Sequence, residues 1–292
     1  MKTYIDCLPC FLRQATEAAR FATGDPSKHH EILRKTLLEA ADFDFNSSPP
    51  EMAKRIHRIV RGVTKQDDPY HLVKKKYNQW AMEQLPVLRK KVKDSKNPLE
   101  VALQLAIAGN IIDFGINGDL HTDEIVKTIE SALACKLDAE AVQQFEKEVT
   151  DAHKILYLTD NAGEIVFDRL LIEQLPARKI TVAVKASPII NDATMEDAEF
   201  TGLTKLVEVI DNGSDAPGTI LRDCSEQFKK RFSEADLVIS KGQGNYETLC
   251  NSNKNIFYIL KIKCKVLARS LNAEIGTLIL KNTKSLSIKE VT

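Results

Sequence analysis

The chain carries no excess of charge of either sign. Its 292 residues include 41 Lys and Arg and 41 Asp and Glu, so the formal net charge is zero. The broadly basic field that attracts nucleic acid or an anionic membrane is therefore absent, and we expect neither as a partner. The short basic runs at residues 74–76 and 89–91 are typical of solvated helix faces.

Long apolar runs are also missing. No stretch reaches the roughly 18 consecutive apolar residues that a membrane-spanning helix needs. The first residues hold neither an apolar segment nor the small-residue cleavage site of a secretory signal. We therefore expect a cytoplasmic protein whose six cysteines are mostly reduced thiols rather than disulfides.

Several familiar catalytic signatures do not occur. The six histidines form no His-x-x-x-His or His-Glu-x-x-His motif, which argues against a zinc hydrolase of that type. Gly-x-Ser-x-Gly, the usual esterase turn, is absent. The glycine-rich segment 241–245 is not a Walker A loop, because its lysine comes first and no Gly-Lys-Ser or Gly-Lys-Thr follows.

Cys7 and Cys10 have the spacing of a redox motif or of one half of a zinc site. No second cysteine pair or histidine pair stands at metal spacing, and a redox motif would be expected after a strand rather than at the N-terminus. We therefore interpret the pair as two packed thiols at the start of a helix.

The first half of the sequence has the marks of helices. Residues 97–100 combine an N-cap amide, a proline at the first helical position and an early glutamate, and they open an apolar run that stops near Gly115. Further helix starts stand at residues 48–51, 68–69 and 122–124. Because glycines and β-branched runs are scarce here, we predict that residues 1–150 form an all-α lobe.

After residue 150 short β-rich runs alternate with helical stretches. We predict strands at residues 155–159, 180–184, 206–210, 237–240 and 256–260, and helices from Glu164, Thr194, Thr219, Tyr246 and Cys264. This alternation implies right-handed crossovers and a mostly parallel sheet. Residues 151–292 are therefore predicted to form an α/β domain.

Three of the predicted strands run into polar residues suited to a metal ion or a phosphate. These residues are Asp160, Asn161 and Glu164 after the first strand, Asn191 and Asp192 after the second, and Lys241 to Asn245 after the fourth. The carboxyl ends of parallel strands share one edge of an open sheet, where ligands bind. Carboxylate and amide oxygens suit Mg²⁺ or Mn²⁺, and a lysine beside a glycine-rich turn suits a phosphate.

Each segment also has a purely structural interpretation. Asp160 and Asn161, like Asn191 and Asp192, could simply cap the following helix, as such residues often do. The glycines could form an ordinary turn, whereas a phosphate cradle explains them together with Lys241. Taken one at a time, the segments leave both interpretations open.

Asn110 and Asp113 stand three residues apart on one face of an otherwise apolar helix. Buried polar side chains need partners, so this pair either bonds to local backbone or faces a polar cleft. We favour the cleft, where the two would line the wall opposite the sheet.

Taken together, the motifs resemble one known family. Cys-x-x-Cys, Gly-Asn-x-x-Asp, Asp-Asn-Ala-Gly-Glu, Asn-Asp-Ala-Thr and Lys-Gly-x-x-Asn-Tyr follow one another over nearly the whole chain. This order resembles the metal-dependent damage-control phosphatases, formerly a domain of unknown function, in their compact microbial branch. The resemblance implies a helical lobe on a Rossmann-like three-layer α/β sandwich, and release of phosphate from sugar phosphates or damaged phosphometabolites.

The resemblance also implies roles for particular residues. The family's metal ligands correspond to Asp160, Asn161 and Asp192, which would hold Mn²⁺, Mg²⁺, Co²⁺ or Ni²⁺. Its substrate contacts correspond to Glu164, Lys241, Gly242, Gln243, Gly244 and Asn245. A further family lysine corresponds to Lys263, although the Arg-Thr-x-Lys form of larger relatives is missing here.

The leading hypothesis is therefore metal-assisted hydrolysis of phosphomonoesters of small metabolites, with Asp160, Glu164 and Lys241 as catalytic residues. We expect water rather than Asp160 to be the nucleophile, because the Asp-x-Asp arrangement of aspartyl-phosphate enzymes is absent. Two alternatives remain: a non-catalytic module that binds a nucleotide or metabolite, and a carboxyl methyltransferase. The sequence does not indicate an oligomeric state.

Overall fold

A six-stranded sheet forms the centre of the computed structural model, which describes residues 1–111 and 122–285. Its strands are β1 (Ile155–Leu158), β2 (Ile180–Val184), β3 (Glu208–Asp211), β4 (Leu237–Lys241), β5 (Ile256–Lys261) and β6 (Leu278–Asn282). They lie in the order β3-β2-β1-β4-β5-β6, with β6 alone antiparallel to its neighbour. This order is that of the doubly wound Rossmann-type sheet, in which the direction of winding reverses between β1 and β4.

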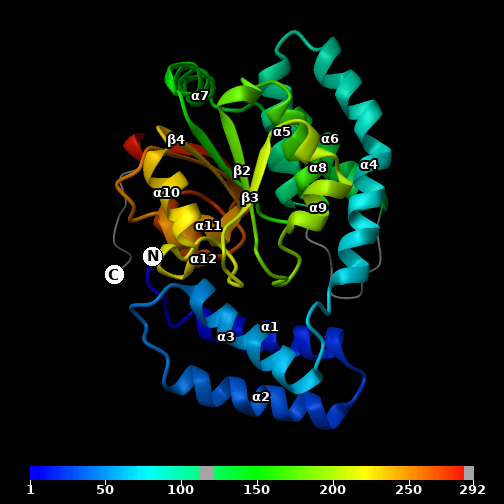
Figure 1. Cartoon of the computed structure of the whole chain (residues 1–292), viewed down its shortest axis with the longest axis vertical. Coiled ribbons are helices and arrows are strands. Elements are labelled where there is room, and N and C mark those ends of the chain that lie inside the picture. Colours follow the sequence, from blue (N-terminus) through cyan, green and yellow to red (C-terminus); the bar gives the residue numbers. More distant parts are fainter. Residues whose placement is uncertain (112–121, 286–292) are drawn as a thin grey trace.

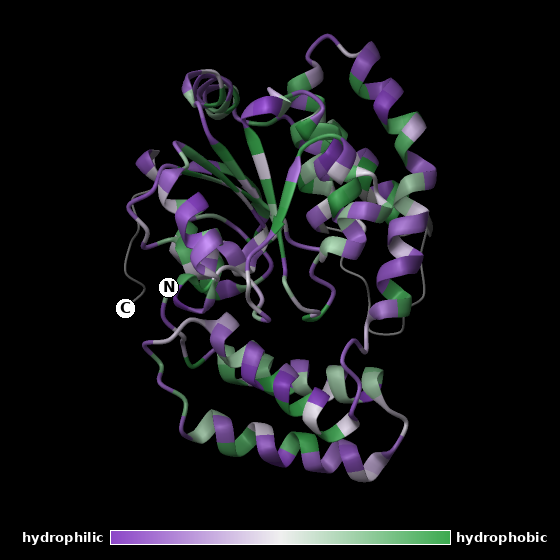
Figure 2. Cartoon of the chain, viewed as in Figure 1, coloured by the Kyte–Doolittle hydropathy of each residue, from purple (hydrophilic) through white to green (hydrophobic). Residues whose placement is uncertain are grey.

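Helices cover both faces of the sheet, so the α/β part is a three-layer sandwich (Figure 1). Ile155 and Tyr157 of β1 point into one core, and Leu156 and Leu158 point into the other, as the alternation along a strand requires. The first core contains α8 (Glu164–Ile172) and α9 (Met195–Phe200). The second contains α10 (Glu226–Glu234), α11 (Gly242–Leu249) and α12 (Lys265–Leu271). The strands between these layers are strongly apolar (Figure 2).

The helices before the sheet fall into two groups. α1 (Cys7–Ala22), α2 (Pro26–Ala41) and α3 (Pro49–Thr64) pack on one another around their own core and lie beneath the sheet in Figure 1. α4 (His71–Asp94), α5 (Pro98–Ile111), α6 (Thr122–Ala134) and α7 (Ala139–Asp151) share a core with the sheet instead. The predicted fold is confirmed, whereas the division into domains near residue 150 stays a prediction.

Most helix starts agree with the sequence signals, and the exceptions have local causes. α5 begins at Pro98 and α3 at Pro49, where a capping box joins Ser48 and Glu51. The helix predicted from Thr219 is wrong: the chain forms a short 3₁₀ turn, η3 (Leu221–Asp223), and α10 starts only after Ser225, whose side chain accepts a hydrogen bond from Phe228. β6 was not predicted from the sequence.

Within the described residues, no helix combines the length and the apolar character needed to cross a membrane.

Candidate functional site

A cleft of about 610 Å³ lies between α1 and α3 on one side and the carboxyl edge of the sheet on the other. On the side of the sheet, the residues singled out in the sequence that line it are Asp160, Asn161, Asn191, Asp192, Gln243, Gly244 and Lys263. The opposite wall mixes thiols, charged groups and apolar side chains, among them Cys10, Arg13 and Pro50. The cleft therefore stands at the switch point of the sheet, where doubly wound proteins bind their ligands.

The loops after β1 and β2 bring Asp160 and Asp192 side by side. β1 and β2 are parallel neighbours, so both end at the same edge. Beyond their ends, the backbone of Ala193 donates to the carbonyl of Asp160 (2.8 Å) and that of Ala162 donates to Asn191 (2.8 Å). A β-bridge joins Asn161 and Asp192. The backbone segments that carry Asp160, Asn161 and Asp192 thus lie side by side.

Two amide side chains join the carboxylates of Asp160 and Glu164. Nδ2 of Asn110 donates to Oδ2 of Asp160 (2.9 Å) and to Oε2 of Glu164 (3.1 Å). Nδ2 of Asn161 makes the same pair of bonds, each at 3.0 Å. Asn110 is buried and comes from α5, so the helical layer closes one side of the cluster. Asp113, predicted beside it, lies outside the described residues.

Lys241 is fully buried beneath the cleft rather than on its surface. Its ammonium group donates to the carbonyl of Ala106 (2.9 Å), to Oε1 of Glu164 (2.5 Å) and to Oδ1 of Asp168. These three bonds use all three N–H donors of the group, so none is left for a phosphate in this arrangement. The geometry makes Lys241 first of all the partner that holds Glu164, and its contact with a substrate stays a prediction.

The helix predicted from Tyr246 starts four residues earlier, so the predicted glycine-rich turn is instead the first turn of α11, and it comes very close to Asp160. Gly242 has a φ of +78°, and a Cβ atom placed on it would overlap the carboxylate of Asp160. Asn245, which is also buried, donates to the carbonyls of Thr159 (3.1 Å) and Lys241 (2.8 Å) and accepts from the hydroxyl of Thr219 (2.7 Å). Asn245 thus ties the ends of β1 and β4 together, and Gly242 leaves room for the carboxylate between them.

The carboxylates of the cleft have raised pKa values, chiefly because they are withdrawn from water. Burial raises the pKa of Asp160 well above its usual range, and the neighbouring Glu164 and Asp192 raise it further. Burial also raises the pKa of Asp192 to about 6, although Lys185 opposes this shift. Lys185 lies 3.5 Å from Oδ2 of Asp192, an ion-pair distance, and that buried oxygen accepts no hydrogen bond from the described residues.

These observations fit a divalent cation held by oxygen ligands. A cation beside Asp160, Asn161 and Asp192 would supply the missing positive charge and a partner for the unsatisfied oxygen of Asp192. In the described part of the chain, no group of three His, Cys, Asp or Glu side chains has the arrangement of a metal site. The predicted set differs from such a group, because one of its three members is an amide.

Three residues of this region were not singled out from the sequence as site residues. Asp168 accepts from Lys241 and from the hydroxyl of Tyr157 (2.8 Å), and Lys185 faces Asp192. Asn78 of α4 accepts from the backbone of Gly163 (2.7 Å). Asp168 follows Glu164 by four residues, which puts both on one helix face, and Lys185 directly follows β2. These two positions could therefore have been recognised in the sequence. The sequence around Asn78 has no feature that indicates its role.

The cysteine pair is placed only partly as predicted. Cys7 is the first residue of α1 and is buried, and burial raises the pKa of its thiol to about 11. Cys10, one turn later, is exposed and lines the cleft, as does Cys264 at the start of α12. The interpretation of two packed thiols at a helix start therefore holds for Cys7 and is wrong for Cys10.

A Rossmann-type sheet with two neighbouring carboxylates of raised pKa at its switch point defines a class of α/β protein suited to metal-assisted chemistry. Comparison with known proteins narrows this class. The model of the damage-control phosphatase ARMT1-like domain matches residues 3–279, nearly the whole chain. The protein belongs to this family, and its enzyme class is that of a metal-dependent phosphatase.

Several known proteins are similar in sequence to this chain over almost their full lengths. A damage-control phosphatase of Pyrococcus horikoshii is 34% identical over 97% of this chain and 99% of its own. A damage-control phosphatase of Archaeoglobus fulgidus is 32% identical over 94% and 97%, and an uncharacterized protein of Methanocaldococcus jannaschii is 37% identical over 93% and 92%. The crystal structure of a DUF89 family protein from Pyrococcus horikoshii has a TM-score of 0.88, with 33% identity over 97% of this chain and 99% of that chain.

Proposed function

We propose that the cleft is the active site and that it hydrolyses phosphomonoesters of small metabolites, with a divalent cation held by Asp160, Asn161 and Asp192. One observation carries the proposal. Two neighbouring carboxylates, the half-buried Asp160 and the buried Asp192, line a cleft at the switch point with raised pKa values and one unsatisfied oxygen, and a divalent cation would remove this imbalance. Family membership supplies the reaction class.

The residues of the cleft have separable roles in this proposal. A bound divalent cation supplies polarisation of a phosphoryl oxygen and activation of water. Glu164 is the proposed base or ligand of a substrate hydroxyl group. It is fully buried and bonded to Asn110, Asn161 and Lys241, so this role requires it to exchange one of these bonds for the substrate. Lys263 lines the cleft, where its positive charge favours an anionic substrate.

The cleft also limits the size of the substrate and the choice of metal ion. Its volume of about 610 Å³ suits a small metabolite such as a sugar phosphate or a damaged phosphometabolite. The proposed ligands are all oxygen atoms, so we expect Mg²⁺, Mn²⁺, Co²⁺ or Ni²⁺ to support turnover. We also propose a cytoplasmic location, in keeping with six free cysteines.

A panel assay tests the proposal directly. Phosphate release would be measured for a set of sugar phosphates and other phosphomonoesters, each with Mg²⁺, Mn²⁺, Co²⁺ or Ni²⁺ and after chelation. We expect turnover of at least one substrate that disappears on metal removal and returns on adding the metal back. Activity that survives chelation, or its absence with every metal, would contradict the proposal. The family does not favour a non-catalytic module or a carboxyl methyltransferase.

Replacing Gly242 by alanine should lower both stability and turnover. The new methyl group would overlap the Asp160 carboxylate, and alanine disfavours a φ of +78°. We expect a loss of about 1–2 kcal/mol in the free energy of unfolding and a clear fall in kcat, measured by thermal unfolding and phosphate release. Gly62→Ala, in the last turn of α3, is the matched control, because its Cβ meets no atom within 4 Å. Equal behaviour of the two variants would refute the close approach of Gly242 to Asp160.

Changing Cys7 and Cys10 together to serine should leave turnover largely unchanged. Neither thiol makes a hydrogen bond to Asp160, Asn161 or Asp192 among the interactions of the described residues. Burying one hydroxyl group in place of the Cys7 thiol should cost some stability, about 1 kcal/mol. Steady-state kinetics together with thermal unfolding check this expectation, and a large fall in kcat at unchanged stability would show that the thiols take part in the reaction.

A further inference from the structure

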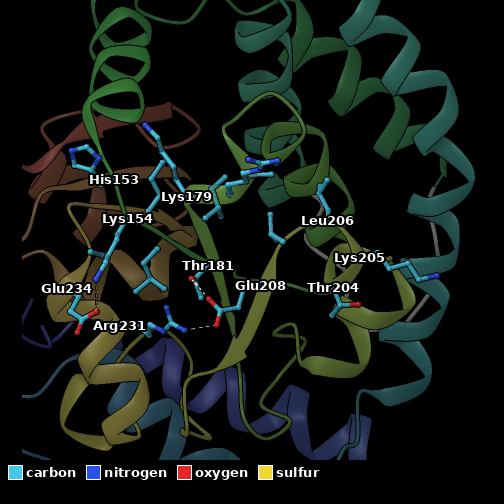
Figure 3. A pocket seen from close by; sticks show the side chains of 17 residues that line it. His153, Lys154, Lys179, Thr181, Thr204, Lys205, Leu206, Glu208, Arg231 and Glu234 are labelled. Carbon is cyan, nitrogen blue, oxygen red and sulfur yellow. Dashed lines mark hydrogen bonds and ion pairs between the residues drawn. The ribbon is translucent and has the colours of Figure 1, made fainter.

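A second cavity, of about 550 Å³, lies at the opposite edge of the sheet from the proposed active site. The starts of β1, β2 and β3 and the end of α10 form its walls (Figure 3). Doubly wound proteins bind ligands at the carboxyl edge, so neither the fold nor the proposed reaction accounts for a cavity at the amino edge.

The lining of this cavity is strongly basic. Its charged side chains are Lys154, Arg178, Lys179, Lys205 and Arg231, with His153 beside them, against only Glu208 and Glu234. The whole chain has a formal net charge of zero. The excess of positive charge in this cavity is therefore local, which makes it a candidate site for an anion.

Ion pairs inside the cavity neutralise only part of that charge. Lys154 pairs with Glu234 (2.9 Å), and Arg231 pairs with Glu208 (2.6 Å), as Figure 3 shows. Both glutamates are thus already engaged. Positive charge without a carboxylate partner remains on the rim.

Three cations of the rim have no carboxylate within ion-pair distance in the described part of the chain: Arg178, Lys179 and Lys205. Lys179 donates only to the carbonyl of Thr150 (2.9 Å), which does not cancel its charge. Figure 3 shows Lys179 on the same side as His153 and Lys154, whereas Lys205 extends away on the far side. The residues that we expect to contact an anion are therefore Arg178 and Lys179, which are neighbours at the end of η1 (Ala177–Lys179).

Between the cations the cavity offers apolar surface. Ile155, Ile180 and Val207 are buried residues that line it, and Ala177 and Leu206 are half-buried at its side. Cavities of roughly 300–1,000 Å³ with apolar walls and a few convergent polar groups are typical of small-molecule sites. This concave form favours a small ligand over a nucleic acid, which would need a basic surface that continues beyond the cavity.

We propose that this cavity binds a small organic anion that carries at least two negative charges beside an apolar or aromatic part, as a nucleoside diphosphate does. The charged groups would lie against Arg178 and Lys179, because a guanidinium group presents paired donors that match phosphate or carboxylate oxygens. The apolar part would cover the floor formed by Ile155, Ile180 and Val207. This site is separate from the phosphatase cleft and does not depend on its function.

Calorimetric titration of the full-length, metal-free protein with ADP tests the proposal, with pyrophosphate as the comparison anion. We expect ADP to bind at one site and more tightly than pyrophosphate, because only ADP can cover the apolar floor. The variant Arg178→Glu/Lys179→Glu should weaken ADP binding by about tenfold or more, since each reversal turns an attraction into a repulsion. Binding should also weaken as the salt concentration rises.

The control variant Lys28→Glu/Arg34→Glu makes the same change of charge on α2, which does not line the cavity. It should bind ADP as the parent does, and both double variants should keep the metal-dependent turnover of the parent. The proposal is overturned if ADP does not bind, if pyrophosphate binds as tightly, or if the control loses as much affinity as the cavity variant. If Asp192→Ala loses ADP binding while the cavity variant keeps it, the ligand lies in the phosphatase cleft and the proposal is overturned. It is also overturned if a single-stranded oligonucleotide binds more tightly than ADP, because the partner is then a macromolecule.

Discussion

Replacing Asp160 by alanine should reduce metal-dependent phosphate release by at least about 100-fold, since even residues that only orient metal ligands are worth 10–100-fold. The change removes a proposed metal ligand and the acceptor shared by Asn110 and Asn161. The stability of the metal-free protein should change little. Burial and the nearby Glu164 and Asp192 raise the pKa of Asp160, so its charged form is disfavoured in the metal-free protein.

Thermal unfolding with and without metal separates ligand loss from unfolding. The parent should gain stability on adding metal, because an ion that binds only the folded state stabilises it. Asp160→Ala should keep its metal-free melting temperature and lose most of that gain. Asp192→Ala should also lose most of that gain, since the side chain of Asp192 lines the cleft and has an unsatisfied oxygen. Its metal-free melting temperature should fall, because the buried ammonium group of Lys185 loses its carboxylate partner.

Asp211→Ala is the matched control for both variants. Asp211 also ends a strand at the carboxyl edge of the sheet, but it belongs to β3 and does not line the cleft. Its replacement should leave turnover and the metal-dependent gain in stability unchanged. Near-parental turnover in Asp160→Ala or Asp192→Ala would remove the metal assignment, and equal losses in all three would indicate a general effect at this edge.

Strand positions could be predicted because most of the strands are buried on both faces. β1, β2, β4 and β5 are mostly apolar and buried over nearly all their residues, and such runs between polar turns can be recognised from the sequence alone. β6 is less buried. It pairs with β5 at the edge of the sheet, where Leu278 and Lys281 are half-buried, and in the described residues no α-helix follows it to mark it as part of the alternation.

The location of the site could be predicted for a topological reason. Parallel strands place all their carboxyl ends at one edge, so Asp160 and Asp192 had to approach each other once the sheet was recognised. The degree to which each side chain is buried could not be predicted in this way. Lys241 stands at a strand end in a glycine-rich turn, which suggests an exposed phosphate ligand. Its burial depends on the carbonyl of Ala106 in α5, a contact between segments 135 residues apart.

Replacing Lys241 by methionine should be among the most damaging single changes in the protein. Burial opposes the charge of Lys241, but Asp168 and Glu164 outweigh this effect and raise its pKa, so the side chain stays positively charged. Without it, two carboxylates are left buried beside each other without a cation. Removal of one partner of a buried ion pair costs about 3–5 kcal/mol of stability, and Glu164 also loses one of the three side chains that hold its carboxylate.

A second substitution separates the structural effect from the catalytic one. Asp168→Asn removes one of the two stranded charges and keeps an oxygen for the hydroxyl of Tyr157. In the double variant Lys241→Met/Asp168→Asn, much of the lost melting temperature should return, whereas kcat should stay low because Glu164 still lacks its ammonium partner. Recovery of kcat together with stability would show that Lys241 acts only on the fold. Unchanged stability in Lys241→Met would mean that the buried network of Lys241, Glu164 and Asp168 is not formed in solution.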